Sequence, residues 1–198
     1  MGLTATHVDD AAPVGRTLQF TVRQVLRMAD VGILREDEHV ELLDGSLFVV
    51  SPKGPRHRSR TNRLHHDLLR VYGDGYVVQQ EAPLIAGETS LPEPDLCVLR
   101  GTDDDFEERD PRADEAVLII EIAWTSQEYD LKKVPLYAGG RAPCLWLLDI
   151  ANRKLAIHEL PTRTGRYRNV RTLTEDDTVE LPLVGVTWRV ADLLPKRG

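Results

Sequence analysis

The sequence predicts an α/β fold, in which a mixed β-sheet is flanked by helices and followed by a C-terminal part of short strands. Two apolar runs, residues 116–123 and 144–150, are rich in Leu, Ile and Val and are typical of strands covered on both faces. Segments with helical periodicity lie before and between these runs, whereas the residues after 150 form short alternating stretches between turn signals. This order of elements is typical of an α/β domain with a mixed sheet.

The composition is that of an ordinary soluble globular protein, with 198 residues, of which 41% are hydrophobic and 29% are charged. This length favours one domain, which we expect to span residues 17–195. Residues 1–16 are small, polar and aperiodic, and we expect them to form a flexible tail. No stretch approaches the roughly 18 apolar residues of a membrane helix, and the amino terminus lacks a basic and then apolar signal layout. We therefore expect no membrane contact and a cytoplasmic location.

The net charge of −7 argues against a protein that coats nucleic acid without specificity. It leaves open an enzyme that presents a local basic surface. Cys97 and Cys144 each lie in an apolar segment, and the sequence contains no CxxC motif. We therefore expect two buried free thiols and no zinc site.

The N-terminal third is expected to form a helix, a hairpin and a second helix. Thr21 and Gln24 form a capping-box pair at the start of the first helix. Asp44 and Gly45 are a strong two-residue turn signal between apolar runs, which predicts a β-hairpin. The second helix is expected from about residue 57 to residue 72.

The second helix carries a basic face. Arg56, Arg60 and Arg63 recur at helical spacing on its expected outer side. Such a face is either a generic solvated surface or a surface that contacts nucleic-acid phosphates.

Strands dominate the rest of the chain. We expect strands in residues 75–86, 95–99 and 116–123, with an acidic surface loop between the last two. A third helix is expected at about residues 131–138, and a buried strand at 144–150. Short antiparallel strands complete the chain.

A glutamate, Glu121, lies near the end of an apolar run. Burying an ionised carboxylate without a partner is costly, so a cation, a metal or a proton is expected beside it. Asp95 follows Pro94 at the start of the preceding strand, where a proline removes no ladder hydrogen bond. If the two strands pair antiparallel, Asp95 and Glu121 become neighbours at one edge of the sheet. A divalent cation would remove their repulsion, and oxygen ligands suit Mg²⁺ or Mn²⁺ better than Zn²⁺.

Two lysines, Lys132 and Lys133, lie early in the helix that follows Glu121. An ammonium group beside a two-carboxylate metal site can stabilise a developing anion. Adjacent residues on a helix point about 100° apart, so only one of the two can face the site.

Together these residues resemble a known family. An Asp after a proline, a Glu at the end of the next strand and a nearby lysine resemble the PD-(D/E)XK, or restriction-endonuclease-like, nuclease superfamily. More closely, the chain resembles the Uma-type family of restriction endonucleases found in bacteria. The resembling stretches, in the family's order from about residue 18 to residue 195, are VELLDG, SPKGPRH, EPDLCVL, IIEIAWTSQEYDLKKVPLYA and CLWLLD.

The resemblance implies a metal-dependent endonuclease that hydrolyses DNA phosphodiester bonds. Asp95 and Glu121 would hold Mg²⁺ or Mn²⁺, with the carbonyl of Ile122 as a further ligand. Glu41 would match the acidic residue that the superfamily places near the metal, and Lys133 would be the catalytic lysine. The accessory positions would be His57, which matches a family histidine at the helix start, Lys132 and Tyr137.

Two features depart from the family's pattern. The superfamily usually carries its lysine two residues after the Glu, where this chain has Ala123. The Uma-type family supplies a lysine from the following helix, four residues before a tyrosine, and Lys133 and Tyr137 keep that interval. The interval from Asp130 to Lys133 is one residue shorter than the family pattern, and Pro135 disfavours a long regular helix before it.

Other interpretations stay open. Glu121 could pair with an arginine in the core, Glu41 could be a solvated strand residue, and the two lysines could be a solvated helix start. The chain could also be a catalytically idle nuclease-fold module for nucleic-acid binding or assembly, or a metal-dependent phosphoesterase that acts on a small substrate. A homodimer is expected for an enzyme that cuts two strands, because two active sites do this most simply.

Overall fold

The computed structural model describes residues 17–35, 37–124 and 127–197. The expected tail, residues 1–16, lies outside the described residues, and the single domain over 17–195 stays a prediction. In the part of the chain that the structure describes, no helix combines the length and the apolar character that crossing a membrane requires.

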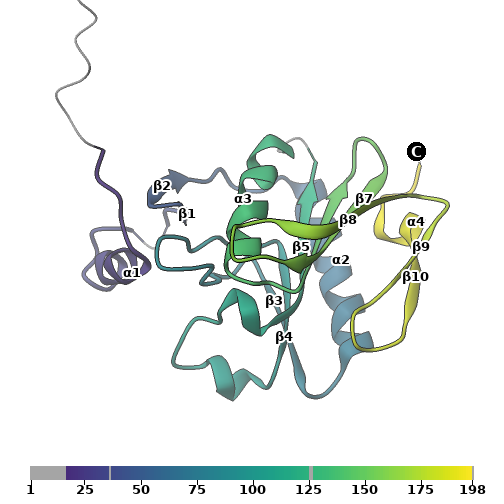
Figure 1. Cartoon of the computed structure of the whole chain (residues 1–198), viewed down its shortest axis with the longest axis horizontal. Coiled ribbons are helices and arrows are strands. Elements are labelled where there is room, and N and C mark those ends of the chain that lie inside the picture. Colours follow the sequence, from purple (N-terminus) through teal and green to yellow (C-terminus); the bar gives the residue numbers. More distant parts are fainter. Residues whose placement is uncertain (1–16, 36, 125–126, 198) are drawn as a thin grey trace, which may run out of the picture.

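A six-stranded mixed sheet forms the centre of the fold (Figure 1). Its strands lie in the order β3-β4-β5-β6-β7-β8, with β5 and β6 parallel and the other neighbours antiparallel. The strands are β3 (Tyr76–Gln80), β4 (Leu96–Arg100), β5 (Ala116–Ala123), β6 (Cys144–Asp149), β7 (Lys154–Pro161) and β8 (Tyr167–Thr174). Cys97 and Cys144 are buried free thiols, as predicted. The predicted α/β class with a mixed sheet is confirmed.

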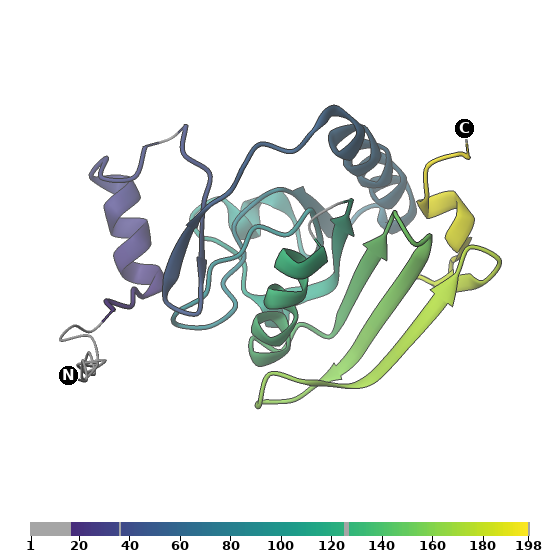
Figure 2. The same ribbon diagram turned by 90° about the horizontal axis from the view of Figure 1, so that it is seen from above.

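Helices cover the two faces of this sheet (Figure 2). α2 (Pro55–Tyr72) packs on one face and α3 (Gln127–Gly139) packs on the other. In β5, Ile120 belongs to the core beneath α2, whereas Ile119 belongs to the core beneath α3. Because side chains alternate along a strand, Glu121 faces α3.

The first predicted elements are present beside the main sheet. α1 (Val22–Asp30) begins with the predicted capping box of Thr21 and Gln24. Asp44 and Gly45 have φ angles of 47° and 77°, and positive φ at both positions is what a tight two-residue hairpin turn requires. The predicted hairpin is confirmed.

The hairpin is fastened to the loop that precedes β4. It consists of β1 (Val40–Leu43) and β2 (Ser46–Val49), which form a sheet of their own. The backbones of Leu42 and Leu91 exchange two hydrogen bonds, of 3.3 and 2.7 Å. This contact brings Glu41 close to the start of β4.

The C-terminal β part is present, with one difference in strand length. β7 and β8 are eight residues long and extend the main sheet. The short strands are β9 (Thr178–Glu180) and β10 (Thr187–Arg189), which pair with each other before α4 (Val190–Leu193). The acidic segment expected as a loop contains two 3₁₀ helices, η1 (Asp103–Phe106) and η2 (Ala113–Glu115).

α3 starts earlier than predicted and continues through Pro135. A proline in a helix interior costs about 3 kcal/mol, because it lacks an N–H group and crowds the preceding turn. Tyr137 and Ala138 follow it and are completely buried against the sheet. Burying one large apolar side chain contributes about 1.5 to 3 kcal/mol, so this packing offsets the proline. The expectation that Pro135 disfavours a long regular helix before it is wrong, because the helix begins at Gln127.

Gly140 follows α3 where the chain passes close to another loop. A Cβ atom at this position would lie 2.9 Å from the Cβ of Ala113 and 3.0 Å from the Cα of Ala86. Gly140→Ala is therefore expected to lower the free energy of unfolding by about 1 to 3 kcal/mol, the usual cost of overpacking. Gly139→Ala is the matched control, because its Cβ would meet nothing within 4 Å. Equal losses in urea unfolding of the two variants would refute this explanation.

Candidate metal and catalytic site

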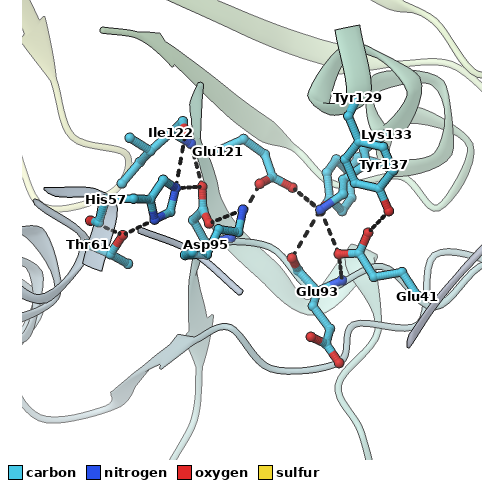
Figure 3. A network of polar contacts seen from close by, with 11 residues as sticks. Glu41, His57, Thr61, Glu93, Asp95, Glu121, Ile122, Tyr129, Lys133 and Tyr137 are labelled. Carbon is cyan, nitrogen blue, oxygen red and sulfur yellow. Dashed lines mark hydrogen bonds and ion pairs between the residues drawn. The ribbon is translucent and has the colours of Figure 1, made fainter. Parts of the chain in front are cut away.

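The register of two strands brings the predicted carboxylates together (Figure 3). β4 and β5 pair antiparallel with Leu96 opposite Ile120, so the next residues, Asp95 and Glu121, face each other. The backbone amide of Asp95 donates a hydrogen bond of 3.4 Å to Oε2 of Glu121. Both side chains are buried, with 1% and 0% exposure. The predicted antiparallel pairing is confirmed.

Nitrogen atoms surround the carboxylate of Asp95. Its Oδ2 accepts a hydrogen bond of 2.6 Å from the amide of Ile122, and Nε2 of His57 lies 3.2 Å from the same oxygen. The ammonium of Lys53 lies 3.1 Å from Oδ1. Burial alone would raise the pKa of Asp95, but the contact with His57 and the charge of Lys53 hold that pKa below its usual value.

Glu121 has a hydroxyl and an ammonium as partners, and not the arginine that one interpretation suggested. The Tyr137 hydroxyl donates a hydrogen bond of 2.6 Å to Oε1, and Nζ of Lys133 lies 3.3 Å from the same oxygen. Burial raises the pKa of Glu121 to about 8, although Lys133 opposes the rise, and the neighbouring Asp95 adds to it. A further cation beside the two carboxylates would favour their ionised forms.

Lys133 lies completely inside the site. Its ammonium donates hydrogen bonds of 2.7 Å to Oε1 of Glu41 and 3.2 Å to the carbonyl of Glu93, and it lies 5.4 Å from the centre of the Tyr129 ring. Burial would lower the pKa of Lys133, but the carboxylates of Glu121 and Glu41 raise it well above its usual value. The side chain is therefore a fixed positive charge.

Lys132 lies on the other side of the same helix turn. Its side chain is exposed, whereas that of Lys133 is 1% exposed. One of the two neighbours faces the carboxylates, as the helix geometry requires, and it is Lys133.

Glu41 is buried, although its alternation with Val40 and Leu42 left a solvated position open. Its Oε1 accepts a hydrogen bond of 3.0 Å from the amide of Glu93, and its Oε2 accepts one from the hydroxyl of Tyr129. The hairpin packs against the loop before β4, and this contact buries Glu41. The surroundings of Glu41 are thus set by docking of the hairpin and not by the strand pattern.

Sequence analysis did not single out Lys53, Glu93 or Tyr129. Lys53 and Tyr129 lie within SPKGPRH and IIEIAWTSQEYDLKKVPLYA, two of the stretches that resemble the family, and this was the signal that could have found them. Glu93 contacts Lys133 and Glu41 through its backbone, so its residue type gives no signal.

Comparison with known proteins decides the family. A family model named Uma2 and described as "Putative restriction endonuclease" matches residues 22–192. The chain belongs to the Uma2 family. The resemblance seen in the sequence is therefore confirmed, and the matched range includes Asp95, Glu121 and Lys133.

The fold of this Uma2 member is also similar to a solved structure. That structure is described as a "putative nuclease belonging to DUF820 from Anabaena variabilis ATCC 29413". The TM-score is 0.69 at 15% sequence identity, and the match covers 88% of this chain and 97% of that chain. No curated protein matches the chain. At this identity the likeness supports the fold.

The donor set of the Uma2 chain fits a hard divalent cation. Asp95 and Glu121 offer carboxylate oxygens, and the carbonyl of Ile122 lies 3.1 Å from Nε2 of His57 beside them. Within the described residues, Oδ1 of Asp95 is buried and accepts no hydrogen bond, and its neighbour is the Lys53 ammonium. Carboxylate and carbonyl oxygens are ligands that Mg²⁺ and Mn²⁺ accept.

A cleft of about 730 Å³ opens beside these residues. Lys53 and His57, both in contact with Asp95, line it together with Trp124 and Tyr129. A ligand in this cleft would therefore meet Lys53 and His57, the two side chains that contact the buried carboxylate of Asp95.

A second groove, of about 630 Å³, adjoins the cleft and shares Trp124 with it. Its basic lining residues are Arg56, Arg60, Arg63 and Lys196. Among the described residues that line the cleft and the groove, none is acidic.

Arg60 departs from the predicted outer face of α2. It is 9% exposed, and its guanidinium donates a hydrogen bond of 3.5 Å to the carbonyl of Asp192 in α4. The outer-face assignment is wrong for Arg60, because the C-terminal segment packs against this side of the helix. Arg56 and Arg63 are exposed.

Proposed function

We propose that this Uma2 member is a divalent-metal-dependent endonuclease that hydrolyses DNA phosphodiester bonds. The observation that carries the proposal is the meeting of Asp95, Glu121 and Lys133 beside an open cleft. The descriptions of the family and of the Anabaena protein support the same class of reaction.

Each group in the site has a defined task in this reaction. Asp95, Glu121 and the carbonyl of Ile122 would hold Mg²⁺ or Mn²⁺. When bound, such an ion offsets the negative charge that develops on a phosphate under in-line attack by water. Lys133 is held 2.7 Å from Glu41 and adds a positive charge that needs no reorganisation during the reaction.

Nucleic acid is the substrate class that the surroundings favour. On a chain with a net charge of −7, the cleft and groove gather cations, including Lys53, Arg56 and Arg63. A basic track of this kind contacts phosphates, and Trp124 at the junction offers an aromatic surface on which a base can stack. A homodimer in the cytoplasm would bring two such sites to a duplex.

A phosphoesterase acting on a small substrate is the second candidate. The cleft of about 730 Å³ has the volume of a small-molecule pocket, and this observation favours it. Competition separates the two enzymes, because a DNA-specific site releases a small phosphodiester when DNA is added.

The test is cleavage by the full chain of supercoiled, linear and single-stranded DNA with Mg²⁺ or Mn²⁺. We expect nicked or shortened products from the wild type and none from Asp95→Asn, which keeps the size of the side chain but removes its charge. Hydrolysis of bis(p-nitrophenyl) phosphate that DNA does not inhibit would favour the small-substrate enzyme. DNA binding without cleavage under every metal would favour the idle module.

A further inference from the structure

His57 makes a distinctive set of contacts next to Asp95. The Thr61 hydroxyl donates a hydrogen bond of 3.0 Å to the backbone carbonyl of His57. The same oxygen lies 3.3 Å from Nδ1 of the His57 ring. Thr61 therefore occupies the Nδ1 side of the ring and leaves Nε2 facing Asp95.

The opposite ring nitrogen faces two further acceptors. Nε2 of His57 lies 3.2 Å from Oδ2 of Asp95 and 3.1 Å from the carbonyl oxygen of Ile122. With its proton on Nδ1, a neutral imidazole offers the lone pair of Nε2 as a metal ligand. Nε2 and the two oxygens can then bind one cation that lies between the three atoms.

The spacing of these atoms fits the ligands of one cation. Adjacent ligands of an octahedral ion with bonds of about 2.1 Å are about 3.0 Å apart. The distances from Nε2 of His57 to the oxygens of Asp95 and Ile122, 3.2 and 3.1 Å, match this edge. The ligand atoms of His57, Asp95 and Glu81 also lie within 4.8 Å of one another. The amide of Glu81 donates a hydrogen bond of 3.3 Å to the carbonyl of Asp95, which keeps this exposed residue beside the site.

We propose that Nε2 of His57 is a ligand of the metal ion and that Glu81 adds an oxygen from the solvent side. This inference rests on the proposed metal site of Asp95, Glu121 and Ile122, to which it adds a nitrogen. An imidazole nitrogen favours a transition metal such as Mn²⁺ over Mg²⁺, which takes oxygen ligands. His57 therefore sets the preference of the site for Mn²⁺.

Pulsed EPR of bound Mn²⁺ detects a nitrogen ligand directly. In the full chain with one equivalent of Mn²⁺, we expect magnetic coupling to a directly bound imidazole nitrogen. The coupling should persist in His66→Gln, an exposed position on the same helix, and disappear in His57→Gln and Asp95→Asn. His57→Gln should weaken Mn²⁺ binding at least about tenfold and Mg²⁺ binding less, so that the preference for Mn²⁺ falls.

Bound Mn²⁺ without nitrogen coupling in the wild type would overturn the inference and leave His57 as a hydrogen-bond partner of Asp95 alone. Absence of Mn²⁺ binding would overturn it as well. Incorporation of ¹⁵N-labelled histidine into the wild type changes the coupling in a known way, so the decision does not depend on the folding of a variant. The EPR measurement does not depend on cleavage, so the two proposals can fail separately. If the chain cuts DNA but bound Mn²⁺ shows no nitrogen coupling, this inference alone is refuted. If bound Mn²⁺ shows nitrogen coupling but the chain cuts no DNA, the proposed function alone is refuted.

Discussion

Lys133→Ala is expected to slow DNA cleavage by about a hundredfold or more, whereas Lys132→Ala should keep most of the wild-type rate. Lys133 lies buried between Glu41 and Glu121, while Lys132 is exposed on the same helix. Loss of a preorganised group that stabilises a transition state typically costs about two to three powers of ten in rate. Cleavage rates at saturating metal concentration measure the difference.

Folding must be controlled in this experiment, because Lys133 also belongs to a buried ion pair. Removing one partner of such a pair costs about 3 to 5 kcal/mol. Lys133→Met, which keeps the apolar stem and removes the charge, is the variant with less disturbed packing. Circular dichroism and thermal unfolding establish whether each variant is folded. The reverse ranking of the two alanine variants would show that the short interval after Asp130 shifts the register and that Lys132 is the catalytic residue.

Millimolar Mn²⁺ or Mg²⁺ is expected to raise the melting temperature of the wild type by about 5 to 10 °C. An ion at about 100 times its dissociation constant stabilises the native state by about 2.7 kcal/mol. For a chain of this size, each kcal/mol shifts the melting temperature by about 2 to 4 °C. The effect is expected because Asp95 and Glu121 are buried together and the ion offsets their repulsion.

Two variants separate this site from other acidic groups. Asp95→Asn should lose the thermal gain, and Asp104→Asn, an exposed carboxylate in η1, should keep it. Calorimetry with and without EDTA supplies the measurement. An equal gain in the wild type and in Asp95→Asn would mean that the ion binds elsewhere, for example at the acidic segment around η1.

The part of the site formed by Asp95 and Glu121 was predictable because strand patterns determine it. Each residue lies at the end of an apolar strand, and antiparallel pairing of neighbouring strands is enough to bring the two ends together. The helix after Glu121 supplied two adjacent lysines, of which only one can face the strand, and the family's four-residue interval to Tyr137 selected Lys133. Local patterns and the family resemblance together therefore contained the central part of the site.

The remaining positions depend on contacts between distant segments, which local patterns do not encode. The strand pattern around Glu41 allowed a solvated position. The residue is buried because the hairpin docks through Leu42. Lys53 lies in a loop without periodicity, and its ammonium reaches Asp95 across the fold. Arg60 follows the basic spacing of its helix, but the C-terminal segment covers it.

Two positions of the sequence, 123 in β5 and 133 in α3, lie on the same side of the sheet as the carboxylate of Glu121. Ala123 lies two residues after Glu121 and therefore on the same face of β5. α3 covers that face, and Nζ of Lys133 lies 3.3 Å from Oε1 of Glu121. An ammonium group can thus reach Glu121 from the strand, as the superfamily usually has it, or from the helix, as in this chain. Because both positions lie on the α3 side of β5, the place of the positive charge in space does not determine its place in the sequence.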